Sequence, residues 1–143
     1  MTKAREPFVM TYRSVLESLA WQRLGLQARR FIDFLMLEHL RHGGKRNGSL
    51  LAPHRQLVAY GIHPGAVAPA IREAVSAGFV DMVHGTGRAP NRYTLTWLDM
   101  ADGIEASHRW QHVAVAPEKA RGRGTIRRRP GDPADAPARP PAP

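Results

Sequence analysis

The chain has 143 residues, 43% of them hydrophobic, which suits one small domain with a buried core. It contains no cysteine, which excludes disulfide frameworks, thiol catalysis and cysteine-based zinc sites and fits a reducing, cytoplasmic location. Lysine and arginine outnumber the acidic residues by 21 to 12, a net charge of +9 that favours polyanionic partners such as nucleic acid. A basic composition imposed by a GC-rich genome explains the same charge. The sequence shows no signal peptide and no apolar run near the roughly 20 residues of a membrane span.

Residues 1–26 are interpreted as an N-terminal arm. Residues 8–12 predict a short strand, and residues 14–24 predict a short helix with apolar side chains at helical spacing. Ser14 stands three residues before Glu17, the spacing of a capping box at the start of that helix.

The strongest helical pattern covers residues 28–42. Arg29 and Asp33 form an i,i+4 pair on its polar side, and Gly43 follows its end. Phe34 and Leu37 widen the apolar face beyond one stripe. We expect this excess to pack against the N-terminal arm or against a second copy of the chain.

Two shorter helices and two strands follow. Residues 49–52 predict a small strand, residues 54–60 a helix, and residues 64–77 a second helix capped by His63. The expected inner face of the second helix consists of Val67, Ile71, Ala74 and Val75. Residues 79–84 and 92–97 predict strands, the latter with Tyr93, Leu95 and Trp97 alternating on one face.

The remaining chain divides into two parts. Residues 101–116 contain Trp110 and Val113 and form a docking or linker segment after a domain at 27–100. Residues 117–143 are rich in Pro, Ala and Arg, a composition typical of a disordered tail. Arg127, Arg128 and Arg129 in this tail are either a phosphate-binding run or a solvated one.

The order of these elements resembles the winged helix-turn-helix domain of bacterial DNA-binding regulators. The resemblance rests on residues 57–67, with their Gly-containing turn, and on residues 70–80 followed by a Gly-rich basic loop and residues 91–95. Residues 5–26 resemble the lead-in of helix-turn-helix proteins from proteobacterial phages, plasmids and mobile elements, and of plasmid replication initiators. The implied fold is α+β, with a three-helix core and a small β-hairpin wing.

The resemblance implies that the second helix of the pair enters the major groove and that the wing touches phosphate or the minor groove. The matching positions in the wing are Arg88, Asn91 and Arg92. Arg55, near the start of the first helix, is either a phosphate contact or a solvated side chain, and Lys45 and Arg46 are expected to be solvated. The matching positions on the recognition helix are His63, Pro64, Gly65, Ala66, Ala68, Pro69 and Arg72.

The expected outer face of the recognition helix departs from the usual pattern. Recognition helices normally offer Arg, Asn, Gln or Ser to base edges, whereas this one offers mostly Ala, Pro and Gly, with Arg72 and His63 as its donors. Two interpretations stay open. Either the small surface lets the helix sit deep, with Arg72 reading guanine, or the helix contacts no bases and the domain binds DNA weakly or binds protein.

Other chemistries have little support. His39 and His42 lie three residues apart with no carboxylate or third ligand expected beside them, so no metal site is predicted. Gly85 and Gly87 lack the context of a nucleotide fingerprint, and no catalytic constellation appears. We expect a cytoplasmic, nucleoid-associated protein that is not an enzyme. It is expected to bind double-stranded DNA, without a cofactor, an effector ligand or a membrane, and a second copy of the chain is a possible partner in a homodimer. The expected role is to regulate transcription of bacterial or mobile-element genes. The alternatives are a replication-initiation factor binding origin repeats and a winged-helix module for protein–protein interaction.

Overall fold

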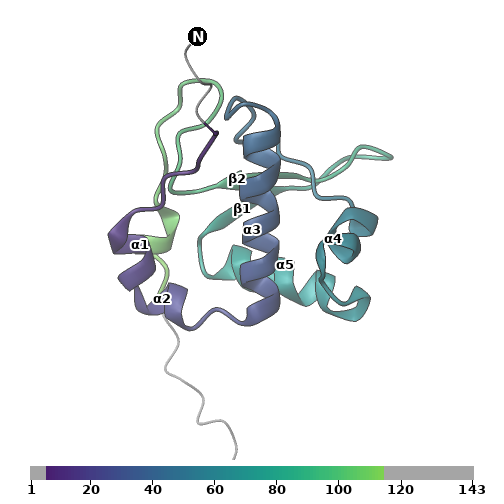
Figure 1. Cartoon of the computed structure of the whole chain (residues 1–143), viewed down its shortest axis with the longest axis horizontal. Coiled ribbons are helices and arrows are strands. Elements are labelled where there is room, and N and C mark those ends of the chain that lie inside the picture. Colours follow the sequence, from purple (N-terminus) through teal and green to yellow (C-terminus); the bar gives the residue numbers. More distant parts are fainter. Residues whose placement is uncertain (1–5, 115–143) are drawn as a thin grey trace, which may run out of the picture.

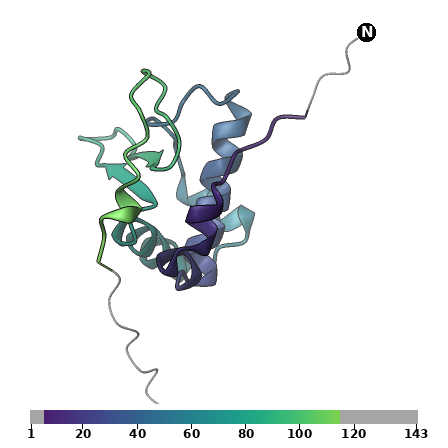
Figure 2. The same ribbon diagram turned by 90° about the vertical axis from the view of Figure 1, so that its left-hand side faces the viewer.

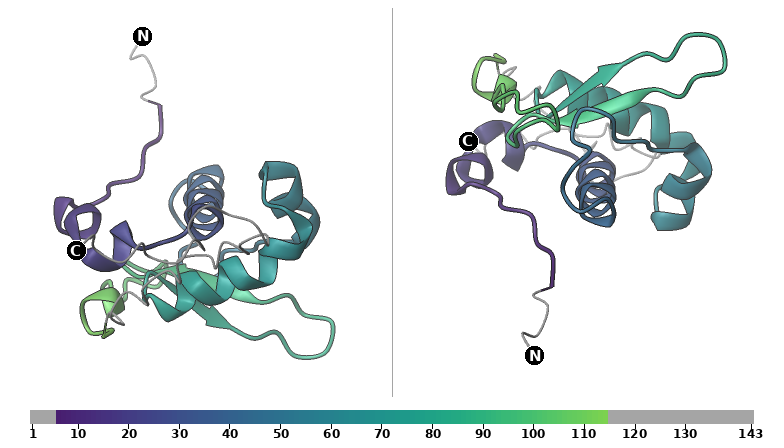
Figure 3. Two further views of the ribbon diagram at one scale, coloured as in Figure 1. Left: turned by 90° about the horizontal axis from the view of Figure 1, so that it is seen from below. Right: turned by 90° about the horizontal axis from the view of Figure 1, so that it is seen from above.

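A computed structural model describes residues 6–114 of the chain. This part is α+β, with five α-helices, two 3-10 turns and a two-stranded antiparallel sheet. Helix α3 (Leu26–Arg41) stands at the centre, and the sheet and helix α5 (Val67–Ser76) lie together on one side of it (Figures 1 and 3). None of the helices in the described part is long and apolar enough to cross a membrane. The tail predicted at 117–143 lies outside the described residues.

The N-terminal arm forms two short helices, α1 (Arg13–Glu17) and α2 (Leu19–Gln22), where one helix was predicted. The break is Ser18, whose backbone is extended and whose Oγ accepts a hydrogen bond from the Trp21 backbone N–H at 3.1 Å. Ser18 therefore caps α2, and the prediction of Ser14 as the cap was wrong. The strand predicted at 8–12 is also absent, because this stretch pairs with no strand and meets the domain through a hydrogen bond from Trp97 Nε1 to the Met10 carbonyl.

Helix α3 begins two residues earlier than predicted. Gly25 precedes it in an extended conformation, and its N–H donates to the Glu73 carboxylate at 2.7 Å. Phe34 is buried and meets the Tyr60 ring edge-on at 5.6 Å between centroids. The expectation that Phe34 contacts the arm or a second copy was therefore wrong, because helix α4 (His54–Tyr60) covers it.

Helix α4 has the predicted bounds, and Gly61 ends it with φ +114°. The predicted helix at 64–77 starts as a 3-10 turn, η1 (Pro64–Ala66), and continues as α5. Its buried side chains are Val67, Ala70 and Ala74. Ile71 and Val75, predicted on the inner face, are only half-buried, because the alanine pair turns toward the core and brings α5 close to α3.

The sheet pairs β1 (Val80–Val83) with β2 (Arg92–Leu95), in a register that sets Val80 opposite Leu95. The strand predicted at 49–52 is reduced to a single bridge between Leu50 and Tyr93. Tyr93, Leu95 and Trp97 are buried as the alternation predicts, but so are Thr94 and Thr96 on the other face. That second face is covered too, because the chain after β2 folds back and His108 N–H donates to the Thr96 carbonyl.

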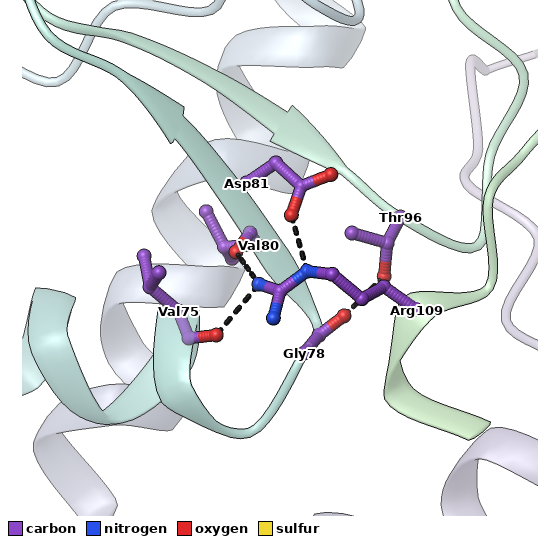
Figure 4. A network of polar contacts seen from close by, with 6 residues as sticks. All are labelled: Val75, Gly78, Val80, Asp81, Thr96 and Arg109. Carbon is purple, nitrogen blue, oxygen red and sulfur yellow. Dashed lines mark hydrogen bonds and ion pairs between the residues drawn. The ribbon is translucent and has the colours of Figure 1, made fainter. Parts of the chain in front are cut away.

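The returning segment ends in a 3-10 turn, η2 (Arg109–Gln111). Trp110 is buried and stacks on Phe79, with ring centroids 5.9 Å apart. The Arg109 guanidinium reaches across the corner between α5 and β1 (Figure 4): it pairs with Asp81 and donates to the Val75 and Val80 carbonyls at 2.6 and 2.8 Å. The segment therefore packs on the domain and ties the end of α5 to the first strand.

Deleting residues 117–143 is expected to leave the melting temperature unchanged, because the core described above lies within residues 6–114. A chain ending at Asp102 is the contrasting truncation, since it also loses Trp110 and Arg109. Loss of a buried Trp costs about 3–5 kcal/mol, so its melting temperature is expected to fall by about 10 °C or more. Thermal unfolding followed by circular dichroism distinguishes the two. A large fall for the shorter deletion would place part of the core beyond residue 116.

Candidate nucleic-acid interface

The beginning of α5, helix α4 and the loop of the β1–β2 hairpin lie on the same side of the molecule. The views in Figures 1 and 3 agree on this arrangement: the hairpin extends past α4, and the turn from α4 into η1 lies on that side. Helices α1 and α2 and the returning C-terminal segment lie on the opposite side. The structure therefore brings together the three segments that hold the predicted site residues.

Helix α5 presents a small, open outer surface. Arg72 is exposed and makes no hydrogen bond or ion pair with the rest of residues 6–114. Its neighbour Glu73 accepts a hydrogen bond from the Gly25 N–H at 2.7 Å. The remaining predicted positions of this helix are exposed, apart from the half-buried Ala66: His63, Pro64, Gly65, Ala68 and Pro69.

His63 has the capping role predicted for it. Its Nδ1 accepts a hydrogen bond from the Gly65 N–H at 3.1 Å. An imidazole nitrogen that accepts leaves the proton on the other nitrogen, so Nε2 is the donor that His63 offers outward. The cap thus fixes both the first turn of the helix and the direction of this donor.

The hairpin loop is shaped by Asn91 and Gly85. Asn91 Oδ1 accepts from the Gly85 N–H at 2.9 Å, and its Nδ2 lies 3.8 Å from Met82 Sδ. A Cβ added at Gly85 would lie 1.9 Å from the Ala89 carbonyl oxygen, so only glycine fits there. Asn91 was predicted as a contact residue, but its amide closes the loop. The side chains left open are those of Arg88 and Arg92, which are exposed.

The base of the hairpin lies beside the start of α4. A pocket of about 230 Å³ lies between them and is lined by residues of both segments: Leu51, Ala52, Pro53, Pro90, Asn91 and Tyr93. Burial raises the pKa of the Tyr93 phenol, and a hydrogen bond with Asn91 lowers it by a smaller amount. The net effect is a raised pKa, so the phenol stays protonated. Arg55, two residues after Pro53, is exposed.

The charge of this side is uneven. From residue 53 to residue 92 the chain carries four arginines and two acidic residues. Both acidic residues are engaged internally, Glu73 by the Gly25 N–H and Asp81 by Arg109. The four arginines, by contrast, are all exposed: Arg55, Arg72, Arg88 and Arg92.

Two residues that shape this region were not singled out from the sequence. Arg109 holds the α5–β1 corner, and Arg30 donates from α3 to the Gly61 carbonyl at 2.7 Å, in the turn between α4 and η1. Both bind partners about 30 residues away in the sequence, and the identity of an arginine alone does not indicate which distant residue it will bind. The position of Arg109 beside Trp110, the one aromatic residue after residue 100, was the available hint.

The histidines of α3 differ in one respect from the expectation. A carboxylate does lie beside them: Glu38 Oε2 is 3.3 Å from His42 Nε2. Burial lowers the pKa of His39, which disfavours its protonated form. Within residues 6–114, no group of three or more potential ligands is placed to hold a metal ion.

Comparison of the chain with protein-family models, with curated proteins and with solved structures found no match. The function is therefore inferred from the arrangement of the residues themselves.

Proposed function

We propose that this chain binds double-stranded DNA through a winged helix-turn-helix domain formed by α3, α4, α5 and the β1–β2 hairpin. The observation that carries the proposal is that α4, α5 and the hairpin each carry exposed arginines, while the two acidic residues of residues 53–92 are engaged internally. Phosphate contacts by such side chains supply most of the affinity for duplex DNA. We infer a binding rather than a catalytic function, and the most fitting role is a regulator of transcription.

The proposed contacts divide by element. Arg55, Arg88 and Arg92 lie on segments that face outward beside the helix pair and suit phosphate groups, which position the protein without reading sequence. Helix α5 enters the major groove, where its alanine and proline surface allows a close approach and its methyl groups meet thymine methyls. Arg72 is the long donor on this face and suits a bidentate contact to guanine O6 and N7.

A protein-interaction module is the second candidate function, and the outer surface of α5 is what favours it. Ala68 and Pro69 offer no side-chain donor or acceptor, and both are exposed. A replication-initiation factor would use the same DNA-binding geometry at origin repeats. Selection of bound fragments from genomic DNA, followed by footprinting, separates the three: sites at promoters, sites at iterated repeats, or no sites.

Arg72→Ala tests whether α5 reads bases. The variant is expected to fold normally and to lose about 1–3 kcal/mol of binding free energy on a selected site, with relaxed preference at one base pair. The measurement is fluorescence anisotropy on the selected duplex and on single-base variants of it. Arg13→Ala removes the same charge from α1, on the opposite side, and should bind a single site as the natural chain does.

One outcome of these measurements would contradict base reading by α5. If Arg72→Ala binds the selected site with unchanged affinity and base preference while variants of the hairpin arginines lose binding, α5 does not read the sequence. The interaction module then becomes the better account of the α5 surface.

A further inference from the structure

Helices α3 and α4 leave a recess between them. It has a volume of about 290 Å³. An apolar cavity of about 150 Å³ is large enough for one benzene ring, so this recess accommodates a single ring with substituents. The residues that line it belong to α3 and α4 alone, and they define what is called here the α3–α4 recess: Phe34, Arg41, Gln56, Ala59 and Tyr60.

Two aromatic rings line the recess at different depths. Phe34 is only 2% exposed, so it forms the floor. Tyr60 is 41% exposed and meets Phe34 edge-on, with ring centroids 5.6 Å apart, so its outer part forms a wall. Aromatic rings in contact gain free energy beyond the area that they bury. The apolar part of the recess therefore favours an aromatic ring as its occupant.

The polar side chains of the recess are hydrogen-bond donors with capacity to spare. Gln56 offers an amide NH₂ and Tyr60 a hydroxyl, and neither side chain makes a hydrogen bond with the rest of residues 6–114. The Arg41 guanidinium lies 3.7 Å from the Glu38 carboxylate, which is longer than a hydrogen bond, and its side chain is 52% exposed. These donors suit a carboxylate, which accepts two parallel hydrogen bonds from one guanidinium.

The charge of the lining distinguishes an anion from a cation. Arg41 is the one charged residue among the lining side chains, so a cation would be repelled, although aromatic rings by themselves attract cations. Glu38, the partner of Arg41, does not line the recess. Its side chain is 11% exposed, and its second carboxylate oxygen lies 3.3 Å from His42 Nε2. The recess thus presents a positive charge beside an aromatic floor.

We propose that the α3–α4 recess is a binding site for a small aromatic carboxylate. Arg41 pairs with the carboxylate, Gln56 and Tyr60 donate to it, and the ring lies on Phe34. No effector ligand was expected from the sequence, because the lining residues come from two helices whose packing has no local signature. The site does not depend on the proposed function, since none of its residues belongs to the candidate nucleic-acid interface.

Titration of benzoate into the isotope-labelled full chain, followed by amide NMR shifts, tests the proposal. We expect one saturable site with a dissociation constant below about 1 mM, with the largest shift changes at residues 34–41 and 56–61. Benzyl alcohol has the ring without the charge, and acetate has the charge without the ring. Each is expected to bind at least about 10-fold more weakly than benzoate, because each makes only part of the contacts.

Three variants separate the parts of the site. Arg41→Gln is expected to weaken benzoate about 10-fold and to leave benzyl alcohol unchanged, because it removes the charge alone. Ala59→Phe places a ring in the recess and is expected to weaken both ligands about 10-fold or more. Arg46→Gln is the matched control, since Arg46 is an exposed arginine outside the lining, and it should bind benzoate as the natural chain does. All three positions are exposed, so the melting temperature should not change.

Several results would overturn the proposal. One is the absence of saturable benzoate binding up to about 10 mM. Others are equal binding of acetate, or an equal loss in Arg41→Gln and Arg46→Gln, because either indicates a general attraction of anions to a chain with net charge +9. Because benzoate binding is measured without DNA, a chain that binds benzoate but no DNA rejects only the DNA-binding function, and the converse result rejects only the recess.

Discussion

Replacing Asn47 with alanine is expected to lower the free energy of unfolding by about 3 kcal/mol, a large share of the stability of a small domain. Asn47 is buried, and its amide serves the backbone after residue 94 from both ends. Oδ1 accepts from the Leu95 N–H at 2.8 Å, and Nδ2 lies 3.0–3.1 Å from the carbonyls of Leu95, Leu98 and Asp99. Alanine removes these bonds and leaves the buried Leu95 N–H without its acceptor, which is the costly case.

Urea unfolding measures this effect, and two other variants isolate its cause. Ser49→Ala, at an exposed neighbouring position, should stay within about 0.5 kcal/mol of the natural chain. Asn47→Asp keeps an acceptor for the Leu95 N–H but loses the donors, so it should remain destabilised at neutral pH. If Asn47→Ala unfolds with the same midpoint as Ser49→Ala, the amide does not hold the two segments together.

Asn47 also marks the limit of what the sequence could predict. Lys45 and Arg46 were expected to be solvated, and nothing local sets Asn47 apart from them, because the partners of Asn47 lie about 50 residues away. The burial of Thr94 and Thr96 could not be predicted for the same reason. Their alternation with apolar residues indicates a solvent-exposed face, but the returning segment covers that face. Long-range cover of this kind has no signature in a window of ten residues.

Features that depend on residues close in sequence could be predicted. The bounds of α4 and the His63 cap followed from proline, glycine and a side chain whose partner is two residues away. The exposed position of Arg72 followed from helical periodicity. Asn91 was expected to face outward, and an asparagine in a hairpin loop has two options, a partner outside or the loop's own backbone. The structure places the Gly85 N–H within its reach, and that contact depends on the close approach at Gly85.

The triple variant Arg55→Ala, Arg88→Ala, Arg92→Ala is expected to lose about two to three powers of ten in DNA affinity at 0.1 M salt. Each phosphate contact contributes about 0.9 to the slope of log affinity against log salt, so removing three contacts should reduce that slope by about 2.7. The loss should be similar for selected and random duplexes, because phosphates carry no sequence information. All three side chains are exposed, so the melting temperature is expected to stay unchanged.

A second triple variant shows whether position or only total charge matters. Arg13→Ala, Lys45→Ala, Arg46→Ala removes the same three charges from exposed positions outside α4, α5 and the hairpin. A general attraction between a basic protein and DNA responds equally to both triples, because at long range only the net charge counts. Contacts at a defined interface respond to the first triple alone, because a released counterion requires a cation at a phosphate. Equal salt slopes for the two triples would therefore reject the interface, even if both variants bind DNA more weakly.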